Sequence, residues 1–392
     1  MNGVSGKGTG LWLVGGRGSV ATTAAVGIVA LSRNLAGPTG LTTASEDFVD
    51  VPLAAFGDIV IGGHDVGTTP LAEKALALSA AGMIDGALVA AVSDGLTAFD
   101  PNILPVPTAE TQQGEIEQRA QDILDFQAKF DLARVVVIDV SSTEPLPAYR
   151  SEFEDRALLE ASLATPGENV LPPSSIGALA AVRAGAAYAC FTPSTSLNLP
   201  VLWQWATDAG IPFAGQDGKT GETLLRTVLA PMFTSRGMKV RSWAGTNLLG
   251  GGDGSTLADP EAVRSKLASK NRGLHALLGN DVVAPLHIDN VPDLGDIKTA
   301  WDHVSAEGFL GSRVILQTTW SAYDSMLAAP LVIDLARLLS LAQATGESGP
   351  MAALGCFFKD PWGSDIHAFA EQSKVLTEWA QHVATRLPVG TP

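Results

Sequence analysis

Three groups of residues in this chain have types and spacings that could carry out chemistry. The first is a glycine loop, in which Gly16, Gly18 and Ala21 give G-x-G-x-x-A between a short apolar run and an Ala- and Val-rich stretch. The first glycine permits a tight turn, the second lets a pyrophosphate approach, and the small third residue lets helix and strand pack closely. Free N–H groups at the helix start then face the anion. The loop predicts dinucleotide binding; the alternative is a glycine turn without a ligand.

The second group lies in GQDGKTGET, residues 215–223, which precedes an apolar run of helical spacing. Four residues lie where this helix should begin and could contact an anion: Lys219, Thr220, Gly221 and Thr223. Backbone N–H groups, hydroxyls and a cation at a helix start suit a dianionic phosphate. The spacing is not that of a Walker loop, so a nucleoside triphosphate is not indicated. The alternative is a capped helix with a solvated lysine.

The third group consists of four lysines in glycine- or aromatic-flanked segments of a lysine-poor chain. Lys266 and Lys270 are four residues apart, which places them on one face if their segment is helical. Lys298 lies between two aspartates, and Lys359 directly follows apolar residues that we expect to be buried. A lysine packed against apolar residues is desolvated unless paired, which moves it towards acid–base chemistry. Each lysine alone is more simply a surface charge, but the four together indicate a site.

An acidic residue for the adenosine ribose of the expected cofactor is less evident. Residues 40–48 offer Ser45, Glu46 and Asp47. The run GGHD at 62–65 follows the second expected strand and could also reach the cofactor, although an ordinary turn explains it nearly as well. A carboxylate at this place would favour NAD over NADP, because it would repel a 2′-phosphate.

The elements that must position these groups alternate between strand and helix. Apolar runs at 10–14, 57–61 and 133–140 predict buried strands, and residues 115–133 have helical spacing with a charged outer face. Residues 326–346 predict a long apolar helix that ends at Gly346 as its C-cap. This alternation predicts an α/β fold with a doubly wound parallel sheet. The residue composition and the pattern of apolar residues change near residue 225, which indicates an inserted second domain.

Bulk composition narrows the class of protein. The chain has 392 residues, 46% hydrophobic and 17% charged, which suits two or three domains with large cores. A net charge of −16 without a basic run argues against nucleic acid as a partner. Two cysteines, Cys190 and Cys356, fit a reducing compartment and small core residues. No signal-peptide pattern or run of about 18 apolar residues is present, so we expect a cytoplasmic protein that does not contact membranes.

Together the segments resemble the myo-inositol-1-phosphate synthase family, particularly its shorter archaeal and bacterial members. The resemblance runs nearly end to end, in family order, through LWLVGGRGSVATT, SSTEPLP, FTPS, GQDGKTGET, TNLLGGGDG, SKLASK, GDIKTAWDHV, GFLGSR, DSMLAAPLVIDLAR and FFKDP. It implies a Rossmann domain over residues 1–224, completed by 325–392. It also implies an inserted α+β catalytic and oligomerisation domain over 225–324, whose sheet builds a homotetramer.

The resemblance also implies a reaction. NAD oxidises C5 of glucose 6-phosphate, and the ketone acidifies the C6 proton. Enolisation lets C6 attack the C1 aldehyde in an intramolecular aldol step, and the NADH formed then reduces the inosose to inositol phosphate. The enolate and alkoxide need fixed positive charge, which lysines can supply. Holding both ends of one sugar favours ring closure by proximity.

Matching motifs carries the family's roles onto residues of this chain. The implied catalytic residues are Lys266, Lys270, Lys298, Lys359 and Asp324. The implied substrate-binding residues are Lys219, Thr220, Gly221, Glu222, Thr223 and Asn247. The implied cofactor-binding residues are Gly16, Arg17, Gly18, Ser19, Val20, Ser142, Thr143, Asp217 and Asp296. Some family members need a divalent metal and others a monovalent cation, for which Asp253 and Asp324 are the expected ligands.

Several positions depart from the family pattern and leave the substrate open. Gln216 and Asp139 each stand where asparagine is usual, and Gly245–Thr246 replaces the common Ser–Tyr. The family is also similar to cyclases of carbocyclic-nucleoside pathways, which turn fructose 6-phosphate into a five-membered cyclitol phosphate with the same lysines and NAD. A dehydrogenase that releases NADH and a non-catalytic nucleotide-binding protein are the rivals outside this chemistry.

Overall fold

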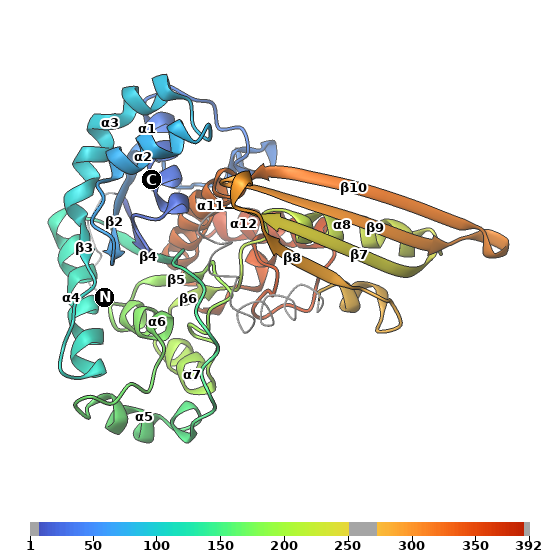
Figure 1. Cartoon of the computed structure of the whole chain (residues 1–392). Helices are drawn as coiled ribbons and strands as arrows, with labels where there is room; N and C mark the ends of the chain where they lie inside the picture. Colours follow the sequence, from blue (N-terminus) through green and yellow to red (C-terminus); the bar gives the residue numbers. More distant parts are fainter. Residues whose placement is uncertain (1–7, 251–272, 388–392) are drawn as a thin grey trace.

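The computed structural model describes residues 8–250 and 273–387 and is built around a seven-stranded parallel sheet (Figure 1). The strand order is β11-β6-β5-β4-β1-β2-β3. The strands are β1 (Thr9–Val14), β2 (Ile59–Asp65), β3 (Ile103–Pro105), β4 (Arg134–Asp139), β5 (Ala187–Cys190), β6 (Pro212–Ala214) and β11 (Gly349–Pro350). The chain runs outward from β1 to β3 and then resumes at β4 on the other side of β1, so the winding reverses between β1 and β4. The predicted doubly wound α/β sheet is confirmed.

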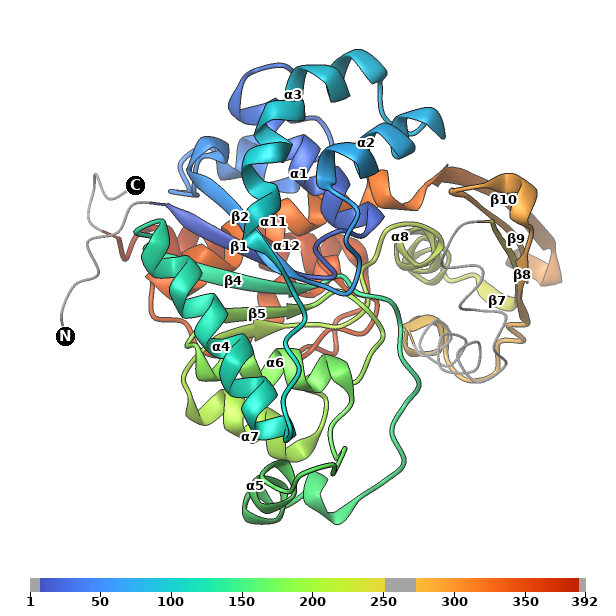
Figure 2. The same ribbon diagram turned by 60° about the vertical axis from the view of Figure 1, so that its left-hand side comes forward.

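Helices cover both faces of this sheet (Figure 2). The helices of one core are α1 (Ser19–Ser32), α2 (Leu71–Ala80), α3 (Gly86–Phe99), α11 (Asp324–Ala344) and α12 (Phe369–Ala384). Those of the other are α4 (Gln112–Lys129), α5 (Arg156–Leu163), α6 (Pro173–Arg183) and α7 (Pro200–Asp208). Successive residues of a strand face opposite cores: Leu11 and Leu13 pack in the first, and Trp12 packs in the second. Both faces therefore require apolar side chains, which explains the continuous apolar run of β4.

Helix α11 is the long apolar helix predicted near residue 326. Among the described residues it alone is long and apolar enough to cross a membrane by those two criteria, but 67% of its most apolar window is buried inside the protein. It packs along α1 and under β4 as a core helix. Gly346, which was predicted to end it, has a φ of +74°, in the left-handed region that glycine adopts without strain.

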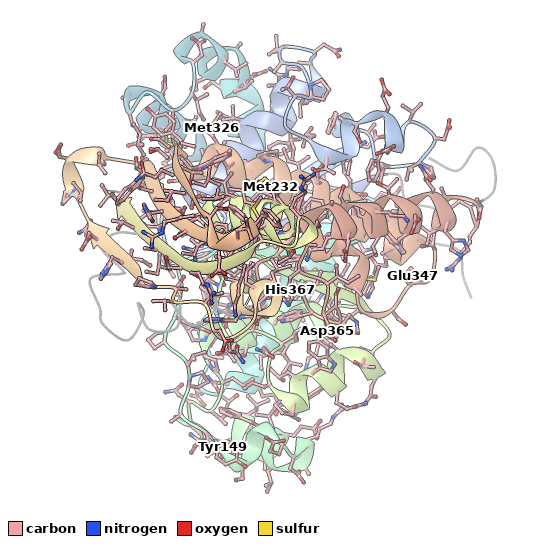
Figure 3. The ribbon with its side chains drawn as sticks, turned by 90° about the vertical axis from the view of Figure 1, so that its right-hand side faces the viewer. Tyr149, Met232, Met326, Glu347, Asp365 and His367 are labelled. Carbon is pink, nitrogen blue, oxygen red and sulfur yellow. The ribbon has the colours of Figure 1, made fainter. Side chains whose placement is uncertain are left out.

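A second, four-stranded sheet has the order β10-β9-β7-β8 (Figure 1). Its strands are β7 (Lys239–Leu249), β8 (Leu286–Asn290), β9 (Ile297–Glu307) and β10 (Arg313–Tyr323); β8 is parallel to β7 and the other pairs are antiparallel. Helix α8 (Glu222–Ser235) packs on one face through Ala230 and Phe233. Figure 3 views the molecule from the side on which the second sheet lies, and Met232 of α8 and Met326 of α11 are labelled there. Trp301 and Ile315 remain about half exposed on the sheet.

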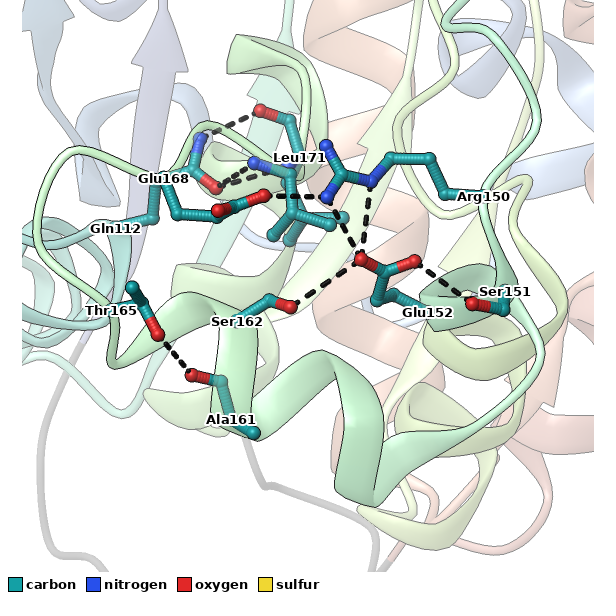
Figure 4. A network of polar contacts seen from close by, with 10 residues as sticks. Gln112, Arg150, Ser151, Glu152, Ala161, Ser162, Thr165, Glu168 and Leu171 are labelled. Carbon is teal, nitrogen blue, oxygen red and sulfur yellow. Dashed lines mark hydrogen bonds and ion pairs between the residues drawn. The ribbon is translucent and has the colours of Figure 1, made fainter.

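The chain leaves β4 as an irregular strap, residues 140–150, that leads to the α5 lobe. Arg150 at its end forms ion pairs with Glu152 at 2.8 Å and Glu168 at 2.6 Å (Figure 4). Gln112 of α4 holds the far side of the lobe through the backbone of Leu171, donating to its carbonyl at 2.8 Å. The start of the strap is held by the N–H of Val140, which donates to the Val14 carbonyl at 3.0 Å, so the strap is fixed at both ends.

Strand β2 extends further than the sequence predicted. The GGHD run was expected to follow a strand at 57–61, either reaching the cofactor or forming an ordinary turn, but it forms the second half of β2. Its glycines are needed for close packing, because a Cβ on Gly63 would lie 2.2 Å from the carbonyl oxygen of Leu13 on β1. Residues 40–48 instead form short 3₁₀ turns, whose Thr42 and Thr43 donate backbone N–H groups to Asp334 of α11.

This close approach of β1 and β2 generates a prediction about stability. We expect Gly63→Ala to lower the free energy of unfolding by about 1–3 kcal/mol, because the added methyl must push the two strands apart. Gly37→Ala is the matched control, since nothing lies within 4 Å of its Cβ position. Urea unfolding of the three proteins measures the difference, and equal stability of Gly63→Ala and the wild type would contradict this packing.

Candidate active site

A cleft of about 850 Å³ lies at the carboxyl edge of the parallel sheet, where the winding reverses between β1 and β4. The glycine loop, the end of β2, the strap after β4 and the first turns of α4 and α6 form its walls. Residues from these elements that line it include Gly15, Arg17, Gly18, Asp65, Gln112, Glu115, Arg119, Ser141, Ser142, Glu144 and Ser174. Ligands of doubly wound folds bind at this edge and at this reversal point.

Backbone hydrogen bonds hold the glycine loop against β2. The N–H groups of Gly15 and Gly16 donate to the carbonyl of His64 at 2.9 and 3.1 Å, and that of Arg17 donates to Asp65 at 2.7 Å. The loop amides are therefore engaged within the protein. The remaining donors for an anion must come from the helix that follows.

Helix α1 begins with an open N-terminus. Gly18 is its N-cap and has no side chain that could cap it, and the first intrahelical bond runs from the N–H of Thr22 to the Gly18 carbonyl at 2.9 Å. The N–H groups of the first three helical residues, Ser19, Val20 and Ala21, have no partner within a helix. They point from the positive end of the helix dipole, which favours a pyrophosphate.

The side chain of Arg17 ties the loop to the neighbouring strands. Its guanidinium forms an ion pair with Asp100 at 2.5 Å and donates to the carbonyls of Thr69 and Ile103 at 3.1 and 3.3 Å. Arg17 was expected to bind the cofactor. The structure gives its side chain a supporting position at one wall of the cleft.

Asp65 belongs to the GGHD run, which the sequence offered for cofactor contact without assigning this carboxylate to the ribose. It ends β2, lines the cleft, and accepts N–H groups from Arg17 and from Gly67 at 2.6 Å. A carboxylate at this position of a dinucleotide-binding fold is placed for the adenosine ribose hydroxyls. Glu46 and Asp47, the other candidates, lie in the 3₁₀ turns that pack near α11 and do not line the cleft. The true length of β2 was the missing signal.

Asp139 ends β4 below the cleft and is almost fully buried. Its Oδ1 accepts the N–H and hydroxyl of Ser141 at 3.0 and 2.6 Å, whereas Oδ2 has no hydrogen-bond partner among the described residues. Burial raises the pKa of this carboxyl to about 6. Of the two strap residues expected to bind the cofactor, Ser142 lines the cleft and Thr143 does not.

Two lysine–aspartate pairs lie at the two ends of the segment 217–220. Lys359 Nζ lies 2.7 Å from Asp217, and both side chains are buried. Lys298 of β9 lies 3.5 Å from Asp324, the first residue of α11, which also accepts the Thr220 hydroxyl at 2.8 Å. The segment thus connects two lysines that are far apart in the sequence.

Lys219, between these pairs, is 3% exposed and turns to α12. Its Nζ donates to the Gln372 side chain at 2.5 Å and lies 5.6 Å from the centre of the Phe369 ring. Burial lowers the pKa of this ammonium to about 8. Its position therefore links the KTGET segment to the C-terminal helix.

The start of α8 carries the remaining substrate-binding candidates. Gly221 is the N-cap and offers no side-chain cap, and Glu222 is the first helical residue. Asn247 of β7 donates to Glu222 at 2.7 Å, so these two candidates touch. Thr223 is buried, and its hydroxyl has no hydrogen-bond partner within the described ranges.

Hydrogen bonds connect this lysine region to the cleft. The N–H of Glu144, in the cleft wall, donates to the Ser194 hydroxyl at 3.3 Å. Gln216, which immediately precedes Asp217, donates to the carbonyl of Pro193 beside it at 3.3 Å. Both regions therefore lie at the carboxyl edge of the same sheet.

Other expected site residues fall elsewhere. Lys266, Lys270 and Asp253 lie outside the described residues. Asp296 lies in the turn before β9 and does not line the cleft, and Asp217 pairs with Lys359. Within residues 8–250 and 273–387, no group of three or more His, Cys, Asp or Glu residues is placed to hold a metal ion.

Comparison with known proteins identifies the family. The sequence profile described as Myo-inositol-1-phosphate synthase matches residues 9–381. The chain belongs to the myo-inositol-1-phosphate synthase family. Members of this family are NAD-dependent isomerases, so the chain is an enzyme of that kind with a dinucleotide-binding domain.

Relatives from distant organisms support the same assignment. Inositol-3-phosphate synthase 1 of Bacteroides thetaiotaomicron is 32% identical over 404 residues, covering 94% of this chain and 92% of that protein. Inositol-3-phosphate synthase 1 of Oryza sativa is 28% identical over 317 residues, covering 74% of this chain but only 61% of the rice protein. The crystal structure of inositol-3-phosphate synthase from Caenorhabditis elegans has the same fold, with a TM-score of 0.85 at 24% identity over 97% of this chain and 86% of that one.

The buried carboxyl of Asp139 generates a prediction about pH. Its pKa of about 6 exceeds the ordinary value of 3.8, so the folded state binds the proton more tightly and stability falls as pH rises from about 4 to 6. We expect Asp139→Asn to remove this decline and to gain up to about 3 kcal/mol over the wild type above pH 6, with no gain at pH 4. Urea unfolding at several pH values measures it. The exposed Asp50→Asn is the control, and parallel pH curves for wild type and Asp139→Asn would contradict the assignment.

Proposed function

We propose that this family member converts glucose 6-phosphate to 1L-myo-inositol 1-phosphate, also called inositol-3-phosphate, by oxidation, enolisation, intramolecular aldol closure and reduction. The observation that carries the proposal is the pairing of Lys298 and Lys359 with aspartates on either side of the segment 217–220. This cluster lies at the same sheet edge as the dinucleotide cleft. Fixed ammonium groups next to a redox cofactor are what an enolate and an aldol alkoxide require.

The cleft supports NAD as the cofactor. The uncapped first turn of α1 would hold the pyrophosphate, and Asp65 would bind the adenosine ribose and disfavour a 2′-phosphate. When bound, NAD supplies a reversible hydride acceptor for a substrate hydroxyl. Ser142 and Glu144, on the strap wall, lie nearer the lysine region and would position the nicotinamide half.

The lysine region would bind the sugar phosphate. The start of α8, with Thr220, Gly221 and Thr223, would take the phosphate, whose charge suits open backbone N–H groups. Lys298 and Lys359 would stabilise oxyanions at the carbonyl that forms and at the ring-closing alkoxide, with Asp324 and Asp217 fixing their positions. A bound cation at Asp324 remains part of the proposal.

The proposal extends to the organisation of the chain. Residues 1–224 and 325–392 would form the dinucleotide-binding domain, and 225–324 the catalytic and oligomerisation domain of a cytoplasmic homotetramer. The half-exposed Trp301 and Ile315 on the second sheet support an assembly surface there. Such apolar residues on an open sheet face are often covered by a neighbouring subunit.

The decisive experiment incubates the protein with NAD and either glucose 6-phosphate or fructose 6-phosphate and reads the product by NMR. We expect a six-membered cyclitol phosphate from glucose 6-phosphate, with flat absorbance at 340 nm at steady state because the hydride is returned. A five-membered product from fructose 6-phosphate would overturn the substrate assignment. Sustained accumulation of NADH would show an ordinary dehydrogenase instead.

Lysine variants test the site itself. We expect Lys298→Ala and Lys359→Ala to lose at least about 100-fold in kcat, because each removes a group that stabilises charge in the transition state. NAD binding, measured by titration calorimetry, should persist in both variants. Asp65→Asn is the control that should weaken NAD binding, and normal turnover in either lysine variant would remove that lysine from the site.

A further inference from the structure

A buried cluster of charged side chains lies beneath the start of α8. Arg226 Nη2 forms an ion pair with Glu222 Oε1, one turn earlier on the helix, at 2.5 Å. The same nitrogen donates to Asp302 Oδ1 on β9 at 3.1 Å. All three side chains are at most 2% exposed. Two carboxylates thus share one guanidinium away from water.

Stability alone is a poor reason for such a cluster. A buried ion pair is often no more stable than apolar residues of similar volume, because the desolvation cost offsets the attraction. Here the second carboxylate adds repulsion, and burial together with the charge of Glu222 raises the pKa of Asp302. What the charged groups do determine is the direction of the hydrogen bonds around them, since a guanidinium can only donate and a carboxylate can only accept.

The cluster sets the orientation of Asn247, a candidate for substrate binding. Asn247 is fully buried, and its Nδ2 donates to Glu222 Oε2 at 2.7 Å. Glu222 Oε2 accepts this hydrogen bond, so it fixes which end of the amide faces it. Arg226 in turn holds the other oxygen of Glu222, and Trp243 Nε1 donates to Asp302 at 2.7 Å.

Gly245 on β7 makes room for this arrangement. A Cβ there would lie 2.6 Å from Arg226 Nη2 and 2.8 Å from Glu222 Oε1. Any larger residue would displace the guanidinium from the strand. The glycine at this position, a departure from the family pattern, is therefore matched to Arg226.

We propose that Arg226, anchored by Asp302, is a positioning residue of the sugar-phosphate site. It acts through Glu222, whose fixed carboxylate holds the amide of Asn247 in one orientation for the substrate. The inference rests on the proposed function, because it needs Asn247 to contact the sugar phosphate.

The test uses glutamine at position 222, which offers one acceptor oxygen where glutamate offers two. In Glu222→Gln the oxygen is expected to face Arg226, since an NH₂ group 2.5 Å from a guanidinium is repelled, so the Asn247 amide meets a donor and loses its hydrogen bond to residue 222. We expect the KM for the sugar phosphate to rise about tenfold, the size of one lost hydrogen bond. The Kd for NAD should not change.

A second substitution should restore the site. In Glu222→Gln/Arg226→Met the glutamine oxygen is released to accept from Asn247, so we expect KM to return to within about threefold of wild type. A merely structural role predicts the opposite, with the double variant worse than either single one. Arg226→Lys, which keeps the charge but loses the fork shape, is the third variant and should raise KM even if the double variant does not fold.

Asp334→Asn is the matched control, because Asp334 is an equally buried carboxylate that binds Thr42 and Thr43 away from the site. It should change the melting temperature without changing KM. Unchanged KM in both Glu222→Gln and Arg226→Lys, with normal wild-type turnover, would overturn this inference alone. Failure of the wild type to bind or turn over either sugar phosphate with NAD would overturn the proposed function and the inference together.

Discussion

The candidate site depends on a short backbone ladder between two segments that are far apart in the sequence. Gln216 and Lys219 donate N–H groups to the carbonyls of Asp360 and Phe357 at 2.7 and 2.8 Å, and Lys359 donates to the carbonyl of Asp217 at 2.7 Å. Gly218 sits in this ladder against the ring of Phe191, where a Cβ would lie only 2.3 Å away. The ladder carries Lys359 to Asp217 and sets the register of the KTGET segment. These bonds bring Lys359 to the start of the segment whose Thr220, at the other end, contacts Asp324 and through it Lys298.

The sequence was most informative where one local rule determines the structure. The continuous apolar residues of β4, the glycine loop before α1 and the apolar helix up to Gly346 are each fixed by nearest neighbours along the chain, and all three are confirmed. The burial of Cys190, Cys356 and the residues before Lys359 is confirmed as well. The family resemblance and the doubly wound sheet follow from the same short motifs.

What could not be predicted depends on contacts between distant segments. The sequence left residues 62–65 open between a cofactor contact and a turn, whereas tight packing against β1 keeps the two glycines in the strand and places Asp65 at its end. The bonds from Lys219 to Gln372 and from Arg226 to Asp302 join helices and strands that no periodicity relates. The role of a charged residue in this acidic chain therefore depends on the side chains that it pairs with, and the folded structure is needed to identify them.

The strap after β4 has a consequence for the direction in which a ligand lies. Three helices, α1, α4 and α6, begin beside the cleft. Thr111 caps α4, and Glu115 lies in its first turn, while Glu144 of the strap accepts the N–H and hydroxyl of Ser174 in the first turn of α6. The positive ends of α4 and α6 are thereby shielded from within the protein, and of these three helices only α1 has no capping or acidic side chain of the described residues at its first turn. An elongated ligand whose negative charge lies away from its midpoint can then bind in one orientation only. The same half of that ligand always lies next to the lysines. Acidic and capping side chains at two of the three helix starts thus determine which end of the cleft attracts negative charge.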